Sequence, residues 1–290
     1  MRKLCDLHTH SYFSDGTLSP TEVVELAERE QLEAVVLCDH NTVMGLDEFI
    51  KAGENKKVVT VPAVEFSTDY GEIELHIIGM FIGRESYHIV TELMEEVQDR
   101  KEKSNIELIN RLRAAGFNIS LEEIKKKTHT GRINRAHIAV ELTEKGYTES
   151  TSDAFKRYLN PSVGYYIPPK RPDSFEIIKF IKKIGGISIL AHPYLNLKTE
   201  SELKAFLNKA KEFGLDGMEV IYPLFSDAET VSAKKLAIEF GLIPSGGSDF
   251  HGTNKPDIQL GKGKRNIEVP VEYYLKLKEK SENKRLNDNL

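Results

Sequence analysis

Short apolar runs alternate with amphipathic helical patterns in the first and last thirds of this 290-residue chain, and no other feature restricts its fold so strongly. Strands joined through helices pair most readily as parallel neighbours, so the alternation predicts an α/β fold with a parallel sheet, open or closed into a barrel. We expect about seven strands, at residues 3–7, 34–38, 58–64, 72–82, 187–190, 217–221 and 242–244.

The helix between the first two strands has a clear start in the sequence. Ser19 is an N-cap residue, proline follows at the first helical position, and Glu22 stands at the capping-box position. The apolar residues that we expect this helix to bury are Val23, Val24, Leu26 and Ala27. Further helices are predicted at residues 44–52, 175–184, 200–213 and 228–240.

The middle of the chain has a different character. Residues 85–157 show helical patterns without intervening strands, interrupted by short basic stretches at 125–127 and 130–132. We therefore predict a discontinuous barrel domain, residues 1–83 and 171–290, and a helical insertion domain at residues 84–170.

Composition limits the classes of partner. The formal charge of −5 argues against broad, charge-driven binding of nucleic acid, so no stable complex with duplex nucleic acid is expected. No run is long enough to span a membrane, and the first residues do not resemble a signal peptide. Cys5 and Cys38 lie in apolar runs and are interpreted as two buried thiols. A cytoplasmic protein without membrane contact is expected.

Residue types that bind metals recur where the predicted strands end. His8-x-His10 alone could equally be a polar strand end with two exposed histidines. However, similar residues recur at the later strands, and the carboxyl ends of parallel strands share one face of a barrel. Six of the nine histidines fall on that face, whereas His88 and His129, in the insertion, are expected to be ordinary solvated residues. The full set comprises His8, His10, Asp39, His40, Glu65, His76, His192, Glu219, Asp249 and His251.

Taken in order, these motifs resemble those of the polymerase and histidinol phosphatase (PHP) superfamily. The segments that carry the resemblance are His8-x-His10, Asp39-His40-Asn41, Glu65, His76, Ala191-His192-Pro193 and Ser248-Asp249-x-His251. The similarity runs from residue 3 to about residue 265. It implies a distorted seven-stranded (β/α)7 barrel and three divalent ions, manganese, iron or zinc, in an enzyme that hydrolyses phosphate esters.

The resemblance also implies which residues hold each ion. It assigns His8, His10, Glu65 and Asp249 to the first ion, Glu65, His76 and His192 to the second, and Asp15, His40 and His251 to the third. Three divalent ions carry about +6 against three carboxylates and a bridging hydroxide, which leaves about +2 to receive a phosphate. Asp39 is expected to orient a ligand, and Glu219 either contacts substrate or hydrogen-bonds a ligand.

A second informative stretch, residues 130–139, resembles the Gly-Arg-x-His-Ile-Ala motif of one branch of the superfamily. In that branch the insertion caps the barrel, so Arg135 and His137 are expected to bind the substrate phosphate and to take part in catalysis. Arg132 competes as the matching arginine, and Lys170 is a further candidate for phosphate binding. Arginine suits this role because its planar fork binds two phosphate oxygens at once.

The function implied by this branch is removal of the 3′-phosphate from nucleoside 3′,5′-bisphosphates, with trimming of 5′-phosphorylated short RNA as a second activity. A hydroxide bridging two metals would attack phosphorus, with Glu65 as the bridging ligand. The enzymatic alternative is a histidinol-phosphate phosphatase or another small-molecule phosphatase. An accessory phosphate-binding domain and an amidohydrolase are alternatives of other classes. The complete ligand set argues against the first of these, and the third metal position and basic cap argue against the second.

Overall fold

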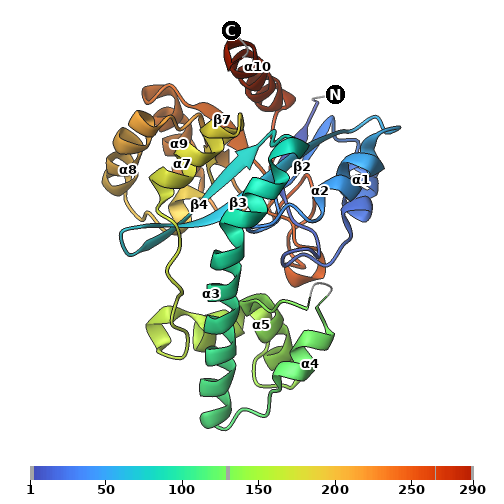
Figure 1. Ribbon diagram of the computed structural model, residues 1–290, viewed down its shortest axis with the longest axis vertical. Helices are drawn as coiled ribbons and strands as arrows, with labels where there is room; N and C mark the ends of the chain where they lie inside the picture. Colours follow the sequence, from blue (N-terminus) through green and yellow to red (C-terminus); the bar gives the residue numbers. More distant parts are fainter. Residues whose placement is uncertain (1–2, 129–130, 265, 289–290) are drawn as a thin grey trace. The chain divides into compact units, whose positions relative to one another are not determined.

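The computed structural model describes residues 3–128, 131–264 and 266–288 (Figure 1). The chain divides into two compact units, one formed by Met1–Thr91 with Arg171–Leu290 and the other by Glu92–Lys170. The first division lies after residue 91, later than the predicted boundary at residue 83, because one continuous helix, α3 (Tyr87–Ala114), runs through the junction.

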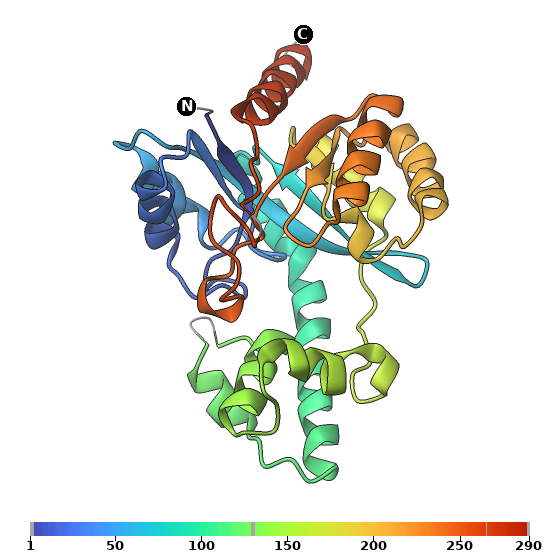
Figure 2. The ribbon, with the colours of Figure 1, turned by 180° about the vertical axis from the view of Figure 1, so that it is seen from behind.

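The first unit contains a seven-stranded sheet whose spatial order follows the sequence. The strands are β1 (Cys5–Thr9), β2 (Ala34–Leu37), β3 (Val59–Tyr70), β4 (Ile73–Met80), β5 (Ile187–Leu190), β6 (Gly217–Ile221) and β7 (Ile243–Gly246). Backbone hydrogen bonds from His10 N to Phe250 O and from Asp249 N to His8 O join β1 to the segment after β7. Figure 2 shows the blue β1 beside this orange-red segment. The sheet is thereby nearly closed, which confirms the predicted seven-stranded α/β barrel.

One prediction about the sheet was wrong. β4 runs antiparallel to both β3 and β5, whereas the other neighbouring strands are parallel. The cause is a hairpin: β3 continues to Tyr70 and returns at Ile73 through the two residues Gly71 and Glu72. Gly71 has a φ of +61°, as the first central residue of a type II′ turn requires. Glu65 consequently lies within a long strand and not at the end of one.

Helices cover the outside of the barrel. They are α1 (Pro20–Arg29), α2 (Leu46–Gly53), α7 (Ser174–Lys183), α8 (Glu200–Phe213), α9 (Asp227–Glu239) and α10 (Val271–Asp288). Figure 1 shows α1 and α2 beside β2 and β3, and α7 and α9 beside the later strands. The predicted capping box of α1 is present, with Ser19 Oγ accepting from the Glu22 backbone, but Leu26 is only partly buried. Within the described ranges, no helix is long and apolar enough to cross a membrane.

The second unit is helical and has its own core. Besides α3 it contains α4 (Leu121–Lys126), α5 (Arg135–Glu144), α6 (Thr151–Ala154), a π-helical turn (Phe155–Leu159) and a 3₁₀ turn (Pro161–Val163). Buried residues of α3, α4 and α5, among them Leu112, Ile124 and Ile138, form one apolar cluster. Asn134 caps α5 through a hydrogen bond from the His137 backbone N–H.

Candidate metal centre

The nine residues expected to bind metal converge on one end of the barrel, although they come from six strands or the loops after them. His8 lies in β1, Glu65 in β3 and His76 in β4. The others follow the ends of β1, β2, β5 and β7, and they are His10, Asp15, His40, His192, Asp249 and His251. Two of them depart from ordinary backbone geometry: His192 has a φ of +26° and Asp249 a φ of +54°. Such strained conformations cluster at functional sites.

The tightest group comprises His8, His10, Glu65 and Asp249. The Nε2 atoms of His8 and His10 are 3.0 Å apart, and each is 3.1 Å from Glu65 Oε2. Asp249 Oδ1 is 3.5 Å from the first nitrogen and 3.3 Å from the second. Two ligand atoms about 2.1 Å from one ion and at right angles to each other are about 3 Å apart. The four side chains therefore fit a single divalent ion.

The other carboxylate oxygen of Glu65 faces a second group. Glu65 Oε1 is 2.7 Å from His76 Nδ1 and 2.9 Å from His192 Nε2. Glu65 itself is completely buried. Because its two oxygens point to different sets of imidazoles, this carboxylate has the geometry of a ligand that bridges two ions.

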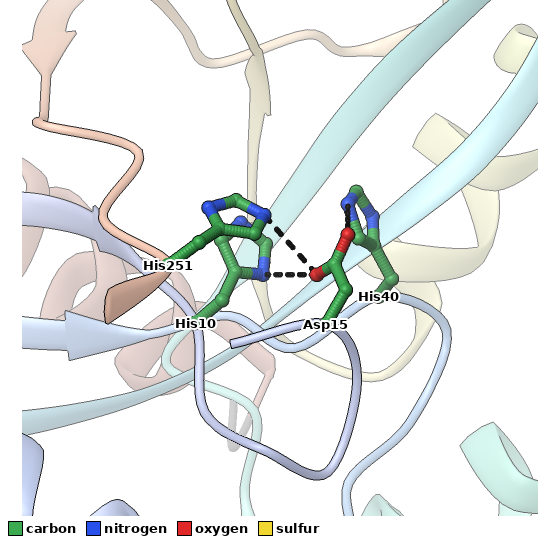
Figure 3. A group of neighbouring side chains, drawn as sticks. All are labelled: His10, Asp15, His40 and His251. Carbon is green, nitrogen blue, oxygen red and sulfur yellow. Dashed lines mark ion pairs between the residues drawn. The ribbon is translucent and has the colours of Figure 1, made fainter. Parts of the chain in front are cut away.

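The third group surrounds Asp15 (Figure 3), and two of its members, Asp15 and His40, are only partly buried. Asp15 Oδ1 is 3.1 Å from His251 Nε2 and 4.0 Å from His10 Nδ1, whereas Asp15 Oδ2 is 3.8 Å from His40 Nε2. The other ring nitrogen of His40, Nδ1, is 3.3 Å from Glu65 Oε2. His40 thus contacts both Asp15 of the third group and Glu65.

The surroundings keep the carboxylates charged. Burial disfavours the ionised form of Glu65, but the imidazoles of His40, His8 and His76 outweigh it and hold the pKa of Glu65 well below its usual value. Asp15 is partly buried, and His251 and His40 outweigh the effect of burial and hold its pKa well below the usual range. Burial also opposes protonation of His76, but Glu65 and Glu74 raise the pKa of His76 to about 9. The ionised carboxylates of this cluster can therefore bind cations, in exchange for protons on the imidazoles.

Glu219 lies behind the first group, completely buried. Its Oε1 accepts a hydrogen bond from His8 Nδ1 at 2.9 Å, and its Oε2 accepts one from the His192 backbone N–H at 2.7 Å. Carboxylates in this position fix the tautomer and the orientation of a metal-binding histidine. Of the two roles predicted for Glu219, this geometry favours the hydrogen bond to a ligand over contact with substrate.

Asp39 contacts the loop that follows β1. Its carboxylate accepts hydrogen bonds from the Ser11 backbone, the Ser11 hydroxyl and the Ser14 hydroxyl, at 2.6–2.8 Å. It therefore anchors the loop that carries Asp15. The orientation of a metal ligand by Asp39 stays a prediction.

Three supporting residues escaped the sequence analysis. Tyr222 Oη donates to Asp249 Oδ2 at 2.7 Å, and Lys255 Nζ is 2.6 Å from the same oxygen. Asp6, completely enclosed at the start of β1, accepts from the backbone and hydroxyl of Ser248. Only their sequence positions could have indicated two of these residues: Tyr222 directly follows a predicted strand, and Lys255 lies in the loop after Asp249. Cys38 and Cys5 are buried free thiols, as predicted.

The candidate phosphate-binding residues of the second unit have contacts of their own. The Arg135 guanidinium lies over the Tyr166 ring, 4.4 Å from its centroid, and His137 Nδ1 accepts from the Asn134 backbone N–H at 3.2 Å. Arg132 forms an exposed ion pair with Asp99, and the other candidate, Lys170, is exposed. Their contact with substrate stays a prediction. His88 is exposed, and His129 lies outside the described residues.

Fold and site together define a class: an α/β barrel protein with a buried imidazole and carboxylate cluster suited to several divalent ions. The model of the PHP domain family matches residues 6–167, more than half of the chain. The chain belongs to this family.

Full-length relatives agree with this assignment. A 5′-3′ exoribonuclease of Haemophilus influenzae is 33% identical over 87% of this chain and 91% of its own length. A 3′,5′-nucleoside bisphosphate phosphatase of Chromobacterium violaceum is 27% identical over 88% of this chain and 90% of its own. Among solved structures, a Bifidobacterium adolescentis protein assigned as a metal-dependent phosphoesterase superposes with a TM-score of 0.84, at 27% identity over 95% of each chain.

Proposed function

We propose that the protein is a metal-dependent phosphoesterase that removes the 3′-phosphate of nucleoside 3′,5′-bisphosphates and also shortens 5′-phosphorylated RNA. The observation that carries the proposal is Glu65, whose two buried oxygens face two separate sets of imidazoles. Two-metal sites of this kind are common in phosphatases and nucleases. The activities named for the two relatives support the nucleotide or short-RNA substrate class.

Three divalent ions are proposed to bind, and manganese is the metal expected. Iron and zinc are alternatives, because imidazole and carboxylate ligands accept all three metals. When bound, such ions lower the pKa of water and stabilise negative charge on phosphoryl oxygens. The protein's own part is to hold the ligands rigidly. Glu219 fixes His8, Tyr222 and Lys255 fix the outer oxygen of Asp249, and Asp39 fixes the loop of Asp15.

The second unit is proposed to supply the contacts to phosphate. Arg135 would bind two phosphate oxygens through its guanidinium, and Lys170 would add a further charge. His137 is proposed to bind the phosphate as a hydrogen-bond donor. Because its Nδ1 accepts a hydrogen bond from the Asn134 backbone N–H, the neutral ring carries its proton on Nε2 and can donate a hydrogen bond from there.

A phosphate-release panel with added manganese tests the proposed substrate. It compares adenosine 3′,5′-bisphosphate, short 5′-phosphorylated RNA, histidinol phosphate and an aryl phosphate. The highest kcat/KM is expected for the bisphosphate, followed by the RNA. A preference for histidinol phosphate would refute the proposed substrate, and no release from any of them would favour an accessory phosphate-binding domain.

The phosphate-binding arginine is tested in the same assay. Arg135→Ala should lower kcat/KM for the bisphosphate by about 10- to 100-fold, as expected for loss of a hydrogen bond to a charged group. Arg132→Ala is the matched control, because it removes a neighbouring charge that forms an exposed ion pair with Asp99. If only Arg132→Ala impairs turnover, the roles of the two arginines are exchanged.

A further inference from the structure

Two carboxylates stand directly opposite each other at the tip of the β3–β4 hairpin. Asp69 pairs with Glu74 across the two antiparallel strands. Like charges in this position destabilise a sheet unless another group neutralises them. Glu74 also lies two residues before His76 on the same face of β4, since side chains alternate along a strand. The carboxylate pair is therefore adjacent to a candidate metal ligand.

Arg171 offsets the repulsion between the two carboxylates. Its Nη1 donates to Asp69 Oδ1 at 3.0 Å, its Nη2 donates to Glu74 Oε2 at 2.7 Å, and its backbone N–H donates to Asp69 Oδ2 at 2.9 Å. Only 8% of the Arg171 side chain is exposed, so this is not an ordinary surface ion pair. The Asp69 N–H also donates to Pro172 O at 2.8 Å, which fixes the backbone after Arg171 against β3.

The remaining oxygen of Glu74 faces the imidazole. Glu74 Oε1 is 3.3 Å from His76 Nε2, and His76 Nδ1 is 2.7 Å from Glu65 Oε1. One nitrogen of this ring thus points to the bridging glutamate, and the other points to a carboxylate that arginine holds in place. A carboxylate that accepts from Nε2–H leaves Nδ1 unprotonated, which is the form of imidazole that binds a metal.

We propose that Glu74, held by Arg171, is a positioning residue that fixes the orientation and tautomer of His76 and so sets the affinity of the ion bound by Glu65, His76 and His192. This inference rests on the metal-binding role proposed for His76. The competing explanation is that Arg171 merely stabilises the hairpin by neutralising two carboxylates. In that case Asp69 would matter at least as much as Glu74, because Arg171 donates two hydrogen bonds to Asp69 and one to Glu74.

Glu74→Gln and Asp69→Asn form a matched pair of variants. Each removes one carboxylate charge beside Arg171, but only Glu74 contacts His76. In Glu74→Gln, an amide NH₂ that faces Nε2 would favour the ring with its proton on Nδ1, which cannot bind the metal. An amide oxygen that faces Nε2 would instead turn the NH₂ group toward the Arg171 guanidinium. Either arrangement weakens the positioning of His76.

The experiment is a calorimetric titration of the metal-free full chain with Mn²⁺ alone. The binding event that His76→Ala abolishes identifies the relevant ion. For that event, Glu74→Gln should weaken Mn²⁺ binding about 10- to 100-fold, the usual effect of losing such a partner. Asp69→Asn should leave it within about twofold, and the other events should not change in either variant. Urea unfolding of each metal-free variant shows whether it is folded.

Three outcomes would overturn the proposal: wild-type affinity in Glu74→Gln, an equal loss in Asp69→Asn, or the absence of any event in the wild-type protein that depends on His76. If Glu74→Gln does not fold, Arg171→Lys is used instead, because a single ammonium cannot bridge both carboxylates as the guanidinium fork does. That variant should weaken the same event selectively. Since no substrate is present, a wild-type protein that binds Mn²⁺ at this position but releases no phosphate would refute the proposed function and leave the positioning role intact.

Discussion

At the scale of single residues, Glu65 has the most demanding surroundings. It is completely buried and lies within 3.3 Å of five imidazoles, those of His8, His10, His40, His76 and His192. A buried carboxylate is costly unless positive charge surrounds it. Protons on the imidazoles supply that charge without metal, and divalent ions would supply it when bound.

Replacing this carboxylate should disable the centre. In Glu65→Gln we expect the bound metal to fall by at least one ion per chain and phosphate release to fall by more than about 100-fold, beyond the usual effect of an outer-shell change. Elemental analysis and a phosphate-release assay measure the two effects. Glu212→Gln, on the exposed face of α8, is the control. A fully metallated Glu65→Gln protein would rule out Glu65 as a ligand.

The histidines make metal binding sensitive to pH. The metal-free protein raises the pKa of His76 to about 9, so this ring carries a second proton at pH 7. A metal binds only the neutral ring, so binding must release protons. The apparent affinity for Mn²⁺ should rise from pH 6 to 8, with net proton release at pH 7. Calorimetric titration in buffers of different ionisation enthalpy measures the number of protons released. If no protons are released on binding, the predicted protonation is wrong.

At the scale of elements, the β3–β4 hairpin determines how two ligands meet. The turn at Gly71 pairs Ser67 with His76, which brings His76 to within two positions of Glu65 along the partner strand. A parallel strand in place of β4, as the sequence first suggested, would need a long crossover connection. The two-residue turn allows Glu65 and His76 to face the same group.

This turn can be tested through its glycine. Gly71→Ala places a Cβ in open space, so the strain of a positive φ is the only penalty. We expect a loss of about 1–2 kcal/mol in the free energy of unfolding, measured with urea. Glu72→Ala, the neighbouring exposed position, should have a smaller effect. Equal stability of Gly71→Ala and the wild type would show that the turn relaxes without strain.

Elements with strong local signals were predictable. The capping box at Ser19 and the strands β5 and β6 were found at or near their observed bounds. The convergence of histidines at one end of the barrel followed from their position after strands. The reversal of β4 was missed because an apolar run carries no information on its direction. Arg171 and Lys255 were missed because their partners lie far away in the sequence or in a loop.

At the scale of the whole molecule, the centre joins both chain segments of the first unit. The donors extend from His8 in β1 to His251 after β7, so almost every strand must be in place for them to meet. Ions that bind this arrangement stabilise the folded protein, because the unfolded chain offers no preformed site.

Manganese should therefore raise the melting temperature. At a free Mn²⁺ concentration of about 100 times Kd, the folded state should gain about 2.7 kcal/mol per independent site. Differential scanning calorimetry with Mn²⁺ and with a chelator measures the shift. The Glu65→Gln protein serves as the reference and should show a much smaller increase. An unchanged melting temperature in the wild type would argue against a structural link between metal and fold.

The position of Asp249 and His251 after β7, the last strand of the barrel, has a consequence for the synthesis of the protein. A nascent chain that has not yet exposed these residues outside the ribosome lacks one ligand of the first proposed ion and one of the third. The proposed phosphoesterase activity therefore cannot begin while translation of the barrel is in progress. If the protein acts on RNA as proposed, it would be inactive toward its own messenger RNA until the barrel is complete.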